Sequence, residues 1–133
     1  MSRKLSNFLG IDFGQKKIGL AVSPGGKLAF GFKVLSKGPG FWLDLEKILH
    51  EQEIDLIVLG MPLKTSGEKC ESSLAVTSFK KELEKRMKNI KVETIDERFS
   101  SKEAQRNLTK NKQQDDQEAA RIILQSFLDL NLK

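Results

Sequence analysis

The order of strand-like and helix-like segments is the feature that most constrains the fold of this chain. Three strand-like segments follow one another near the N-terminus, at 8–14, 17–23 and 28–35. Short turns separate them, which predicts an antiparallel meander. Helical spacing then alternates with short apolar runs, at 41–52, 54–59, 72–87, 92–95, 101–108 and 116–130. This order predicts an α/β fold: a mixed five-stranded sheet, its first three strands antiparallel, flanked by helices.

The composition is that of one ordinary domain. The chain has 133 residues, of which 38% are hydrophobic and 31% charged, so residues 1–133 are expected to form a single packed domain. No apolar run is long enough to span a membrane, and the N-terminus does not have the pattern of a signal peptide. The single cysteine, Cys70, cannot form an internal disulfide, which favours a reducing, cytoplasmic location.

The charge is basic and unevenly distributed. The net charge is +5 and the pI about 9.4. Basic blocks at residues 1–40 and 80–112 alternate with acidic blocks at 41–79 and 113–133. A basic surface predicts a polyanionic partner, most often nucleic acid, although many basic proteins bind none. Charge alone therefore does not decide whether the protein binds nucleic acid or is basic for another reason.

Asp12 is the most informative single residue. It is the only acid among the first forty residues, and it is flanked by apolar residues in a predicted strand. A buried carboxylate needs compensation, which a metal ion or a neighbouring Lys16 or Lys17 can supply. Gly10 and Gly14, beside it, are interpreted as leaving room for a phosphate backbone. Asp12 is therefore a candidate metal ligand, with an ion pair to lysine as the alternative.

Further acids follow the last predicted strand. Glu97 lies just beyond it, at a strand end where α/β sheets present reactive groups. Its neighbour Asp96 is an alternative ligand, and the sequence does not separate the two. Arg98 can hold a phosphate through two parallel hydrogen bonds. An exposed ion pair between these charges is the alternative interpretation.

Two acids mark the start of the last predicted helix. Asp115 and Glu118 have the spacing of a capping box, so Asp115 is expected to cap the helix. Asp116 is then free to point elsewhere. Ala119 and Ala120 follow it, and small residues let a helix lie close to a sheet. That approach is expected to bring Asp116 toward the first strand.

Three carboxylates on separate elements suit a hard divalent cation. Mg²⁺ prefers oxygen ligands, and such ions activate water and stabilise the leaving oxygen in phosphodiester cleavage. No rival constellation is evident, because His50 lies in a predicted surface helix and Cys70 has no obvious base. The sequence also has no phosphate-binding GxxxxGK[ST] loop.

Four segments occur together and in register. They read LGIDFG with KIGLAVS at 9–23, VLGMPL with Gly67, DERFS at 96–100 with Ala104, and Asp116 before Ala119, Ala120 and ILQ at 123–125. In these segments the chain closely resembles the YqgF family, also called RuvX or Holliday-junction-resolvase-like. It departs from the usual family pattern at Pro24, at Ala29-Phe30-Gly31 and at Lys16-Lys17, none of which is one of the three carboxylates.

The resemblance implies a ribonuclease-H-like fold and a bacterial cytoplasmic nuclease. Its implied role is maturation of the 5′ end of pre-16S ribosomal RNA in ribosome biogenesis, with Mg²⁺ or Mn²⁺ as cofactor. Carried over residue by residue, Asp12, Glu97 and Asp116 are the catalytic, metal-holding carboxylates. Lys17 and Arg98 are expected to bind the substrate backbone. The expected partner is structured RNA or branched DNA, acted on by a monomer or weak homodimer.

Three alternatives remain open from the sequence. The first is a Holliday-junction resolvase acting on branched DNA. The second is a non-catalytic nucleic-acid-binding module. The third is an actin-like or sugar-kinase-like ATPase, because Asp12-Phe13-Gly14 resembles the phosphate loop of those enzymes. Such ATPases place the nucleotide between two domains of this fold, and this chain has room for one.

Overall fold

The structure is a computed structural model that describes residues 6–63, 66–97 and 112–131. Its elements, in chain order, are β1 (Asn7–Phe13), β2 (Lys17–Pro24), β3 (Phe30–Ser36), α1 (Phe41–Glu51), β4 (Leu56–Met61), α2 (Glu71–Arg86), β5 (Lys91–Asp96) and α4 (Lys112–Asn131). The predicted helix at 101–108 lies outside the described residues. None of the helices in the described part of the chain has the length and apolar character of a membrane span.

The strands form one mixed sheet in the order β3-β2-β1-β4-β5. β2 is antiparallel to both β1 and β3, whereas β4 is parallel to both β1 and β5. The predicted five-stranded sheet with three antiparallel first strands is therefore confirmed. Because only β2 is reversed, the other four strands end on the same side. We call this side, where Phe13, Ser36, Met61 and Asp96 end their strands, the carboxyl edge.

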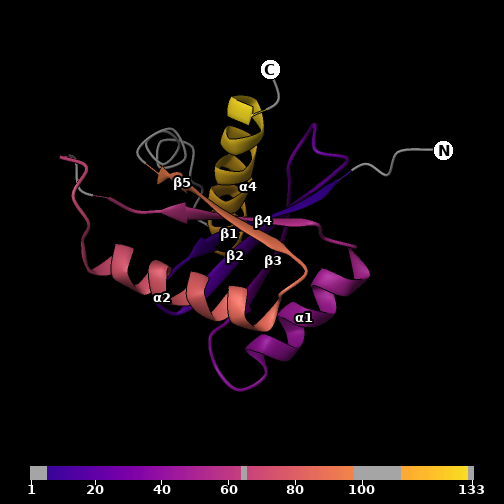
Figure 1. The fold of residues 1–133 in the computed structure, drawn as a ribbon, viewed down its shortest axis with the longest axis horizontal. Coiled ribbons are helices and arrows are strands. Elements are labelled where there is room, and N and C mark those ends of the chain that lie inside the picture. The colour runs from indigo at the N-terminus through magenta and orange to yellow at the C-terminus, as the bar shows by residue number, and fades with distance from the viewer. Residues whose placement is uncertain (1–5, 64–65, 98–111, 132–133) are drawn as a thin grey trace.

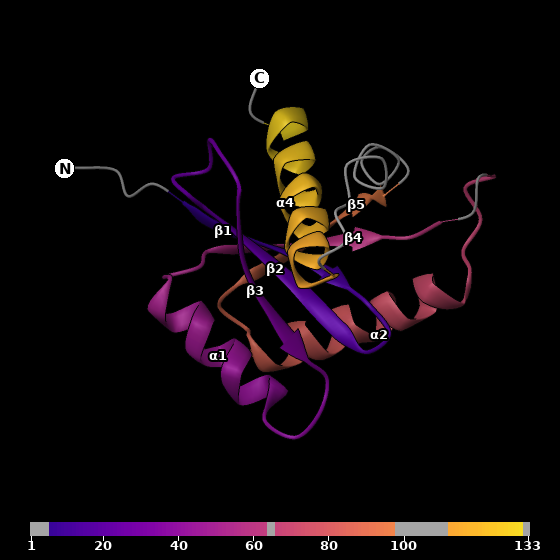
Figure 2. The same ribbon diagram turned by 180° about the vertical axis from the view of Figure 1, so that it is seen from behind.

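Helices cover both faces of the sheet. α4 crosses one face, and α1 and α2 cover the other (Figures 1 and 2). Side chains alternate along β1, so that Leu9 and Ile11 enter the apolar cluster under α1 and α2. Gly10, between them, faces α4, whose apolar side packs Ala120 and Leu124 against the sheet. The sheet is thus the middle layer of three.

Glycines let α4 lie unusually close to the sheet. A Cβ atom at Gly10 would lie 2.7 Å from the Cβ of Leu124, and one at Gly19 would lie 2.1 Å from the backbone oxygen of Asp116. On the helix side of this contact, Ala120 is fully buried. The prediction that small residues bring this helix close to the sheet is confirmed, and the sheet contributes glycines of its own.

Gly19→Ala is expected to destabilise the protein. The added methyl group meets helix backbone, which cannot move alone, so we expect the free energy of unfolding to fall by about 2 kcal/mol. Gly31→Ala is the matched control, because its Cβ would lie 3.1 Å from the Cβ of Gln117, a contact that a small shift relieves. Urea denaturation followed by circular dichroism measures both. Equal stability of the two variants would contradict the close contact.

The predicted start of the last helix is wrong. α4 begins at Lys112, so Asp115 lies inside the helix and does not cap it. The physical reason is that Lys112, Gln113 and Gln114 are good helix formers, and they extend the helix before the acidic pair. Asp116 consequently lies more than one turn into α4 rather than in its first turn.

Candidate active site

Asp12 lies where the carboxyl edge meets α4. It is the next-to-last residue of β1 and pairs with Gly19 of β2. Its neighbours Ile11 and Phe13 pack into the cluster under α1 and α2, so the alternation of the strand directs Asp12 toward the α4 face. The residue is partly buried. A carboxyl group is therefore held at the rim of the packed interior.

Glu97 contacts Asp12 from the end of β5, which lies two strands away from β1 in the sheet. It directly follows β5, and its side chain occupies space that Gly60 leaves open: a Cβ at Gly60 would lie 2.5 Å from the Oε1 atom of Glu97. The carboxyl groups of Glu97 and Asp12 are hydrogen-bonded to each other. Of the two adjacent acids at the end of β5, Glu97 contacts Asp12, whereas Asp96 acts on Glu97 through charge repulsion.

Asp116 reaches the site from α4, the helix that packs across one face of the sheet. The close contact between α4 and Gly19 places the Asp116 backbone against the residue that pairs with Asp12. Asp116 is partly buried, and its charge acts on Asp12. The three predicted carboxylates, more than one hundred positions apart at the extremes, are thus brought to one corner of the fold.

Burial and charge raise the pKa values of the carboxyl pair. The pKa of Asp12 rises from 3.8 to about 6, mainly because the group is desolvated, with repulsion from Asp116 adding to the effect and the Glu97 hydrogen bond opposing it. The pKa of Glu97 rises from 4.5 to about 7, again mainly through desolvation, with repulsion from Asp12 and Asp96 in the same direction. Below about pH 7 the pair therefore retains a shared proton, which offsets the like-charge repulsion.

The donor set fits a divalent cation. Mg²⁺ is usually held by one or two carboxylates and several waters, and Asp12 with Glu97 is such a pair. A cation can replace the shared proton and neutralise the repulsion. Among the described residues, however, no three Asp, Glu, His or Cys side chains are arranged to hold a metal ion. Asp116 is near enough to act by charge, but in this conformation it does not complete a three-residue cluster.

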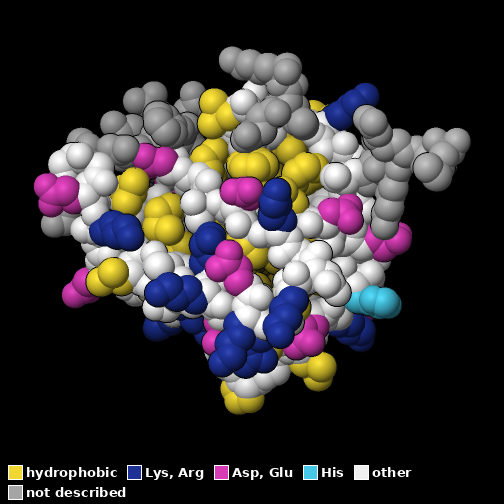
Figure 3. Space-filling model, in the orientation of Figure 1, with side chains coloured by type: hydrophobic (Ala, Val, Ile, Leu, Met, Phe, Trp, Pro, Cys, Tyr) yellow, Lys and Arg dark blue, Asp and Glu magenta, His cyan; other side chains and the backbone are white. Residues whose placement is uncertain are grey.

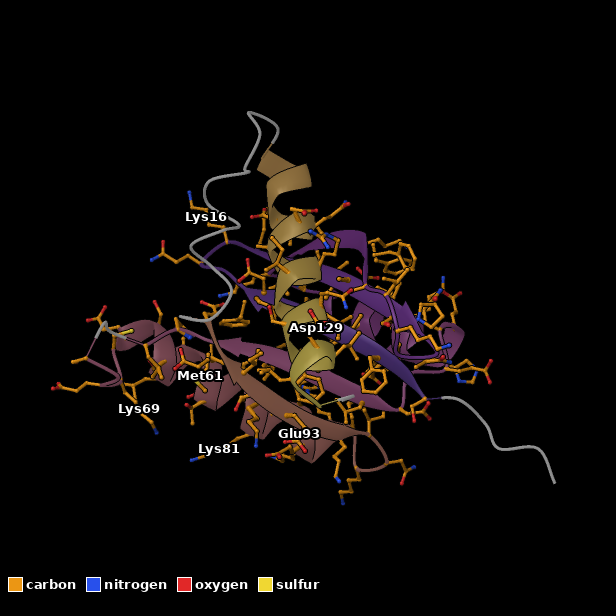
Figure 4. The ribbon with its side chains drawn as sticks, turned by 90° about the horizontal axis from the view of Figure 1, so that it is seen from above. Lys16, Met61, Lys69, Lys81, Glu93 and Asp129 are labelled. Atoms are coloured by element: carbon orange, nitrogen blue, oxygen red, sulfur yellow. The ribbon has the colours of Figure 1, made fainter. Side chains whose placement is uncertain are left out.

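The two predicted substrate-binding residues have different outcomes. Lys17 begins β2, two residues before Gly19, so its side chain belongs to the same face as Asp12. Lys16, beside it, and Met61 at the end of β4 lie on the same side of the molecule (Figure 4). Basic side chains therefore adjoin the carboxyl edge. Arg98 lies outside the described residues.

The interpretation of two glycines changes. Gly10 and Gly14 were expected to admit a phosphate backbone. Gly10 instead accommodates α4, while Gly14 forms a tight turn in which its N–H donates to the Lys17 carbonyl at 3.0 Å. Sequence reasoning also missed the positioning roles of Gly19 and Gly60. The available signal was a glycine inside a predicted strand, which often marks a close approach of another element.

The two side chains that could have offered rival chemistry lie elsewhere. Cys70 is the N-cap of α2, where its Sγ lies 3.4 Å from the Oγ of Ser73. His50 lies in the last turn of α1 and lines a hollow with Asp55, at the edge opposite the carboxyl edge. Neither side chain joins the carboxylates.

The fold and the site define a class of protein. The structure of RuvC from Thermus thermophilus matches with a TM-score of 0.51 and 13% identity, covering 95% of this chain and 96% of RuvC. RuvC in complex with a Holliday junction substrate matches with the same TM-score and identity, covering 96% of each chain. At this identity the likeness shows the fold alone, which is ribonuclease-H-like.

The family follows from the sequence. Residues 6–130 match the family model RuvX, described as Holliday junction resolvase. The chain therefore belongs to the RuvX family. A relative from Maridesulfovibrio salexigens is 35% identical, covering 90% of this chain and 96% of its own length. One from Mycoplasmopsis synoviae is 36% identical, covering 92% and 96%. Both are provisionally named pre-16S rRNA nuclease.

Proposed function

We propose that this protein is a metal-dependent nuclease that hydrolyses phosphodiester bonds in RNA and processes the 5′ end of pre-16S rRNA. The observation that carries the proposal is the hydrogen-bonded pair of Asp12 and Glu97 at the carboxyl edge, with Asp116 beside it. Two carboxyl groups held together with raised pKa values are costly for stability, which is typical of a functional site. The named relatives supply the substrate class.

Each residue of the site has a proposed role. Asp12 and Glu97 would hold the cation, and Asp116 would add negative charge that attracts it. When bound, Mg²⁺ or Mn²⁺ activates water and stabilises the leaving oxygen of the scissile phosphodiester. Lys17 and Arg98 would orient the RNA backbone by pairing with its phosphates. Ribosomal RNA as substrate implies a cytoplasmic enzyme.

Cleavage of four-way DNA junctions is the second candidate. It is favoured by the family description and by the fold shared with a RuvC that was solved with a Holliday junction. The two candidates require the same carboxylates, so the site does not separate them. A protein that binds nucleic acid without cutting is the remaining alternative.

A side-by-side cleavage assay separates the candidates. With Mg²⁺ or Mn²⁺, we expect cutting of a 5′-extended pre-16S rRNA fragment to exceed cutting of a four-way DNA junction by at least about tenfold in kcat/KM, a difference of about 1.4 kcal/mol. Chelation of the metal should stop both reactions. Faster cutting of the junction would reverse the assignment, and metal-independent binding without any cutting would favour a binding module.

A further inference from the structure

A second hollow lies beside the candidate active site, on the face of the sheet that α1 and α2 cover. Its volume is about 200 Å³, and it is lined by Phe13, Ile18, Lys37, Gly38, Phe41, Trp42 and Phe79. We call this hollow the aromatic pocket. Its walls come from β1, β2, the loop after β3, and helices α1 and α2.

The aromatic rings of the pocket stack on one another. The rings of Phe13 and Phe79 are parallel within 29°, with centroids 4.5 Å apart. Trp42 lies 5.5 Å from Phe79, at 31° to it. Phe79 is buried, whereas Phe13 and Trp42 keep part of their surface open to solvent. The pocket is therefore lined by aromatic rings, the kind of side chain on which nucleobases stack.

Cationic groups lie over these rings. The Nζ atom of Lys37 is 3.8 Å from the centroid of the Phe13 ring, and the guanidinium of Arg86 is 4.4 Å from that of Trp42. Lys37 is the one charged residue that lines the pocket. Partial burial lowers the pKa of Lys37. A polyanion at the mouth of the pocket would favour the charged form of this lysine.

The pocket is next to the candidate active site. Phe13 follows Asp12 in β1, so the two side chains point to opposite faces of the same strand end. Lys37 follows the last residue of β3 at the carboxyl edge, and its backbone N–H donates to the Lys16 carbonyl at 3.1 Å. Lys16, Lys17 and Lys37 thus lie at adjacent strand ends along the carboxyl edge, and we call these three lysines the basic rim.

The wider surface agrees with a polyanionic partner. Lys and Arg side chains gather over the part of the molecule covered by α1 and α2, with Asp and Glu side chains between them (Figure 3). The basic rim also disfavours an apolar protein segment as occupant, because such a segment offers nothing to pair with three lysines.

We propose that the aromatic pocket binds one unpaired nucleobase of the RNA substrate, while the backbone of that RNA follows the basic rim to Asp12. The inference deepens the proposed function, on which it rests, by adding a requirement for a single-stranded nucleotide near the cut. The base would take the place that the Lys37 ammonium occupies over the ring of Phe13 and would contact the exposed part of Trp42, while Lys37 would turn to pair with an adjacent phosphate.

The chain carries its own reporter for this test. Trp42 is the only tryptophan, and there is no tyrosine, so intrinsic emission reports on the pocket. The probes are a single-stranded oligoadenylate of about ten nucleotides and a ribose-phosphate chain of equal length and charge without bases. In EDTA, which prevents cutting, we expect the oligoadenylate to quench Trp42 and to bind about tenfold more tightly than the abasic chain.

Paired variants locate the effect. With fluorescently labelled probes, Trp42→Leu should remove the advantage of the base-bearing chain, and Trp42→Phe should retain most of it. Lys37→Gln should weaken binding of both chains. Lys91→Gln, an exposed lysine at the start of β5 and so at the edge opposite the carboxyl edge, should change neither. Thermal melting checks that each variant folds. The comparison of the two probes on the parent protein needs no variant.

Two results would overturn the proposal: equal affinity of the parent for both chains, or saturation with oligoadenylate that leaves Trp42 emission unchanged. The cleavage assay separates this failure from that of the proposed function. If the parent cuts pre-16S rRNA but binds the two chains equally well, only the assignment of the aromatic pocket is wrong. If the parent prefers the base-bearing chain but cuts nothing, the nuclease assignment falls and the pocket remains.

Discussion

Asp12→Asn is expected to reduce kcat/KM for pre-16S rRNA cleavage by about a thousandfold or more, without unfolding the protein. The carboxylate that would hold the cation is lost, and the stabilisation that a bound metal gives to phosphodiester cleavage amounts to several kcal/mol. An amide of the same shape can still hydrogen-bond to Glu97, so the packing at the carboxyl edge is retained. The measurement is cleavage at saturating Mg²⁺ or Mn²⁺.

The control variant is Asp44→Asn, which neutralises an exposed acid on α1. It should cut like the parent. Thermal melting in EDTA should show Asp12→Asn to be at least as stable as the parent, because a poorly solvated charge has been removed. An Asp12→Asn protein that is folded and cuts at the parental rate would eliminate Asp12 as a ligand.

In EDTA, the free energy of unfolding is expected to fall by about 2 kcal/mol between pH 5 and pH 8, after a discount for partial exposure. Both carboxyl groups of the pair have folded-state pKa values above their unfolded values, at about 6 for Asp12 and about 7 for Glu97. Their protonated forms therefore stabilise the fold. That contribution is fully present below the unfolded pKa values and is lost as the pH rises through 6 and 7.

Added Mn²⁺ should oppose this loss. The ion stabilises the folded state by binding to it, and it competes with the shared proton. The rise in melting temperature caused by Mn²⁺ should therefore be large at pH 8 and small at pH 5. Asp12→Asn and Glu97→Gln should each flatten the pH dependence in EDTA, and Asp44→Asn should not. A parent protein whose stability in EDTA rises from pH 5 to pH 8 would contradict the shared proton.

The sheet could be predicted because its signals are local. Each apolar run predicts a strand on its own, and parallel pairing of β1, β4 and β5 follows from the helices between them. The start of α4 was misplaced because a polar stretch without apolar periodicity gives a weak helix signal. The acidic pair that follows it looked like a cap.

Part of the site could also be predicted from local sequence signals. An isolated acid in an apolar strand identifies Asp12, but whether Asp96 or Glu97 faces it depends on how β5 ends and on the space at Gly60. The roles of Gly19 and Gly60 could not be derived from their own neighbourhoods in the sequence. They depend on side chains and backbone that arrive from distant elements.

The glycine contacts bear on how members of this family should be sorted into active and inactive proteins. A chain can keep every acidic residue and still lose the arrangement if a single methyl group appears at Gly19 or Gly60, because that carbon would occupy the place of the Asp116 backbone or of the Glu97 carboxyl. Inspection of the acids alone would classify such a chain as competent. Gly19 and Gly60 are therefore as informative about whether the site can form as the three carboxylates are.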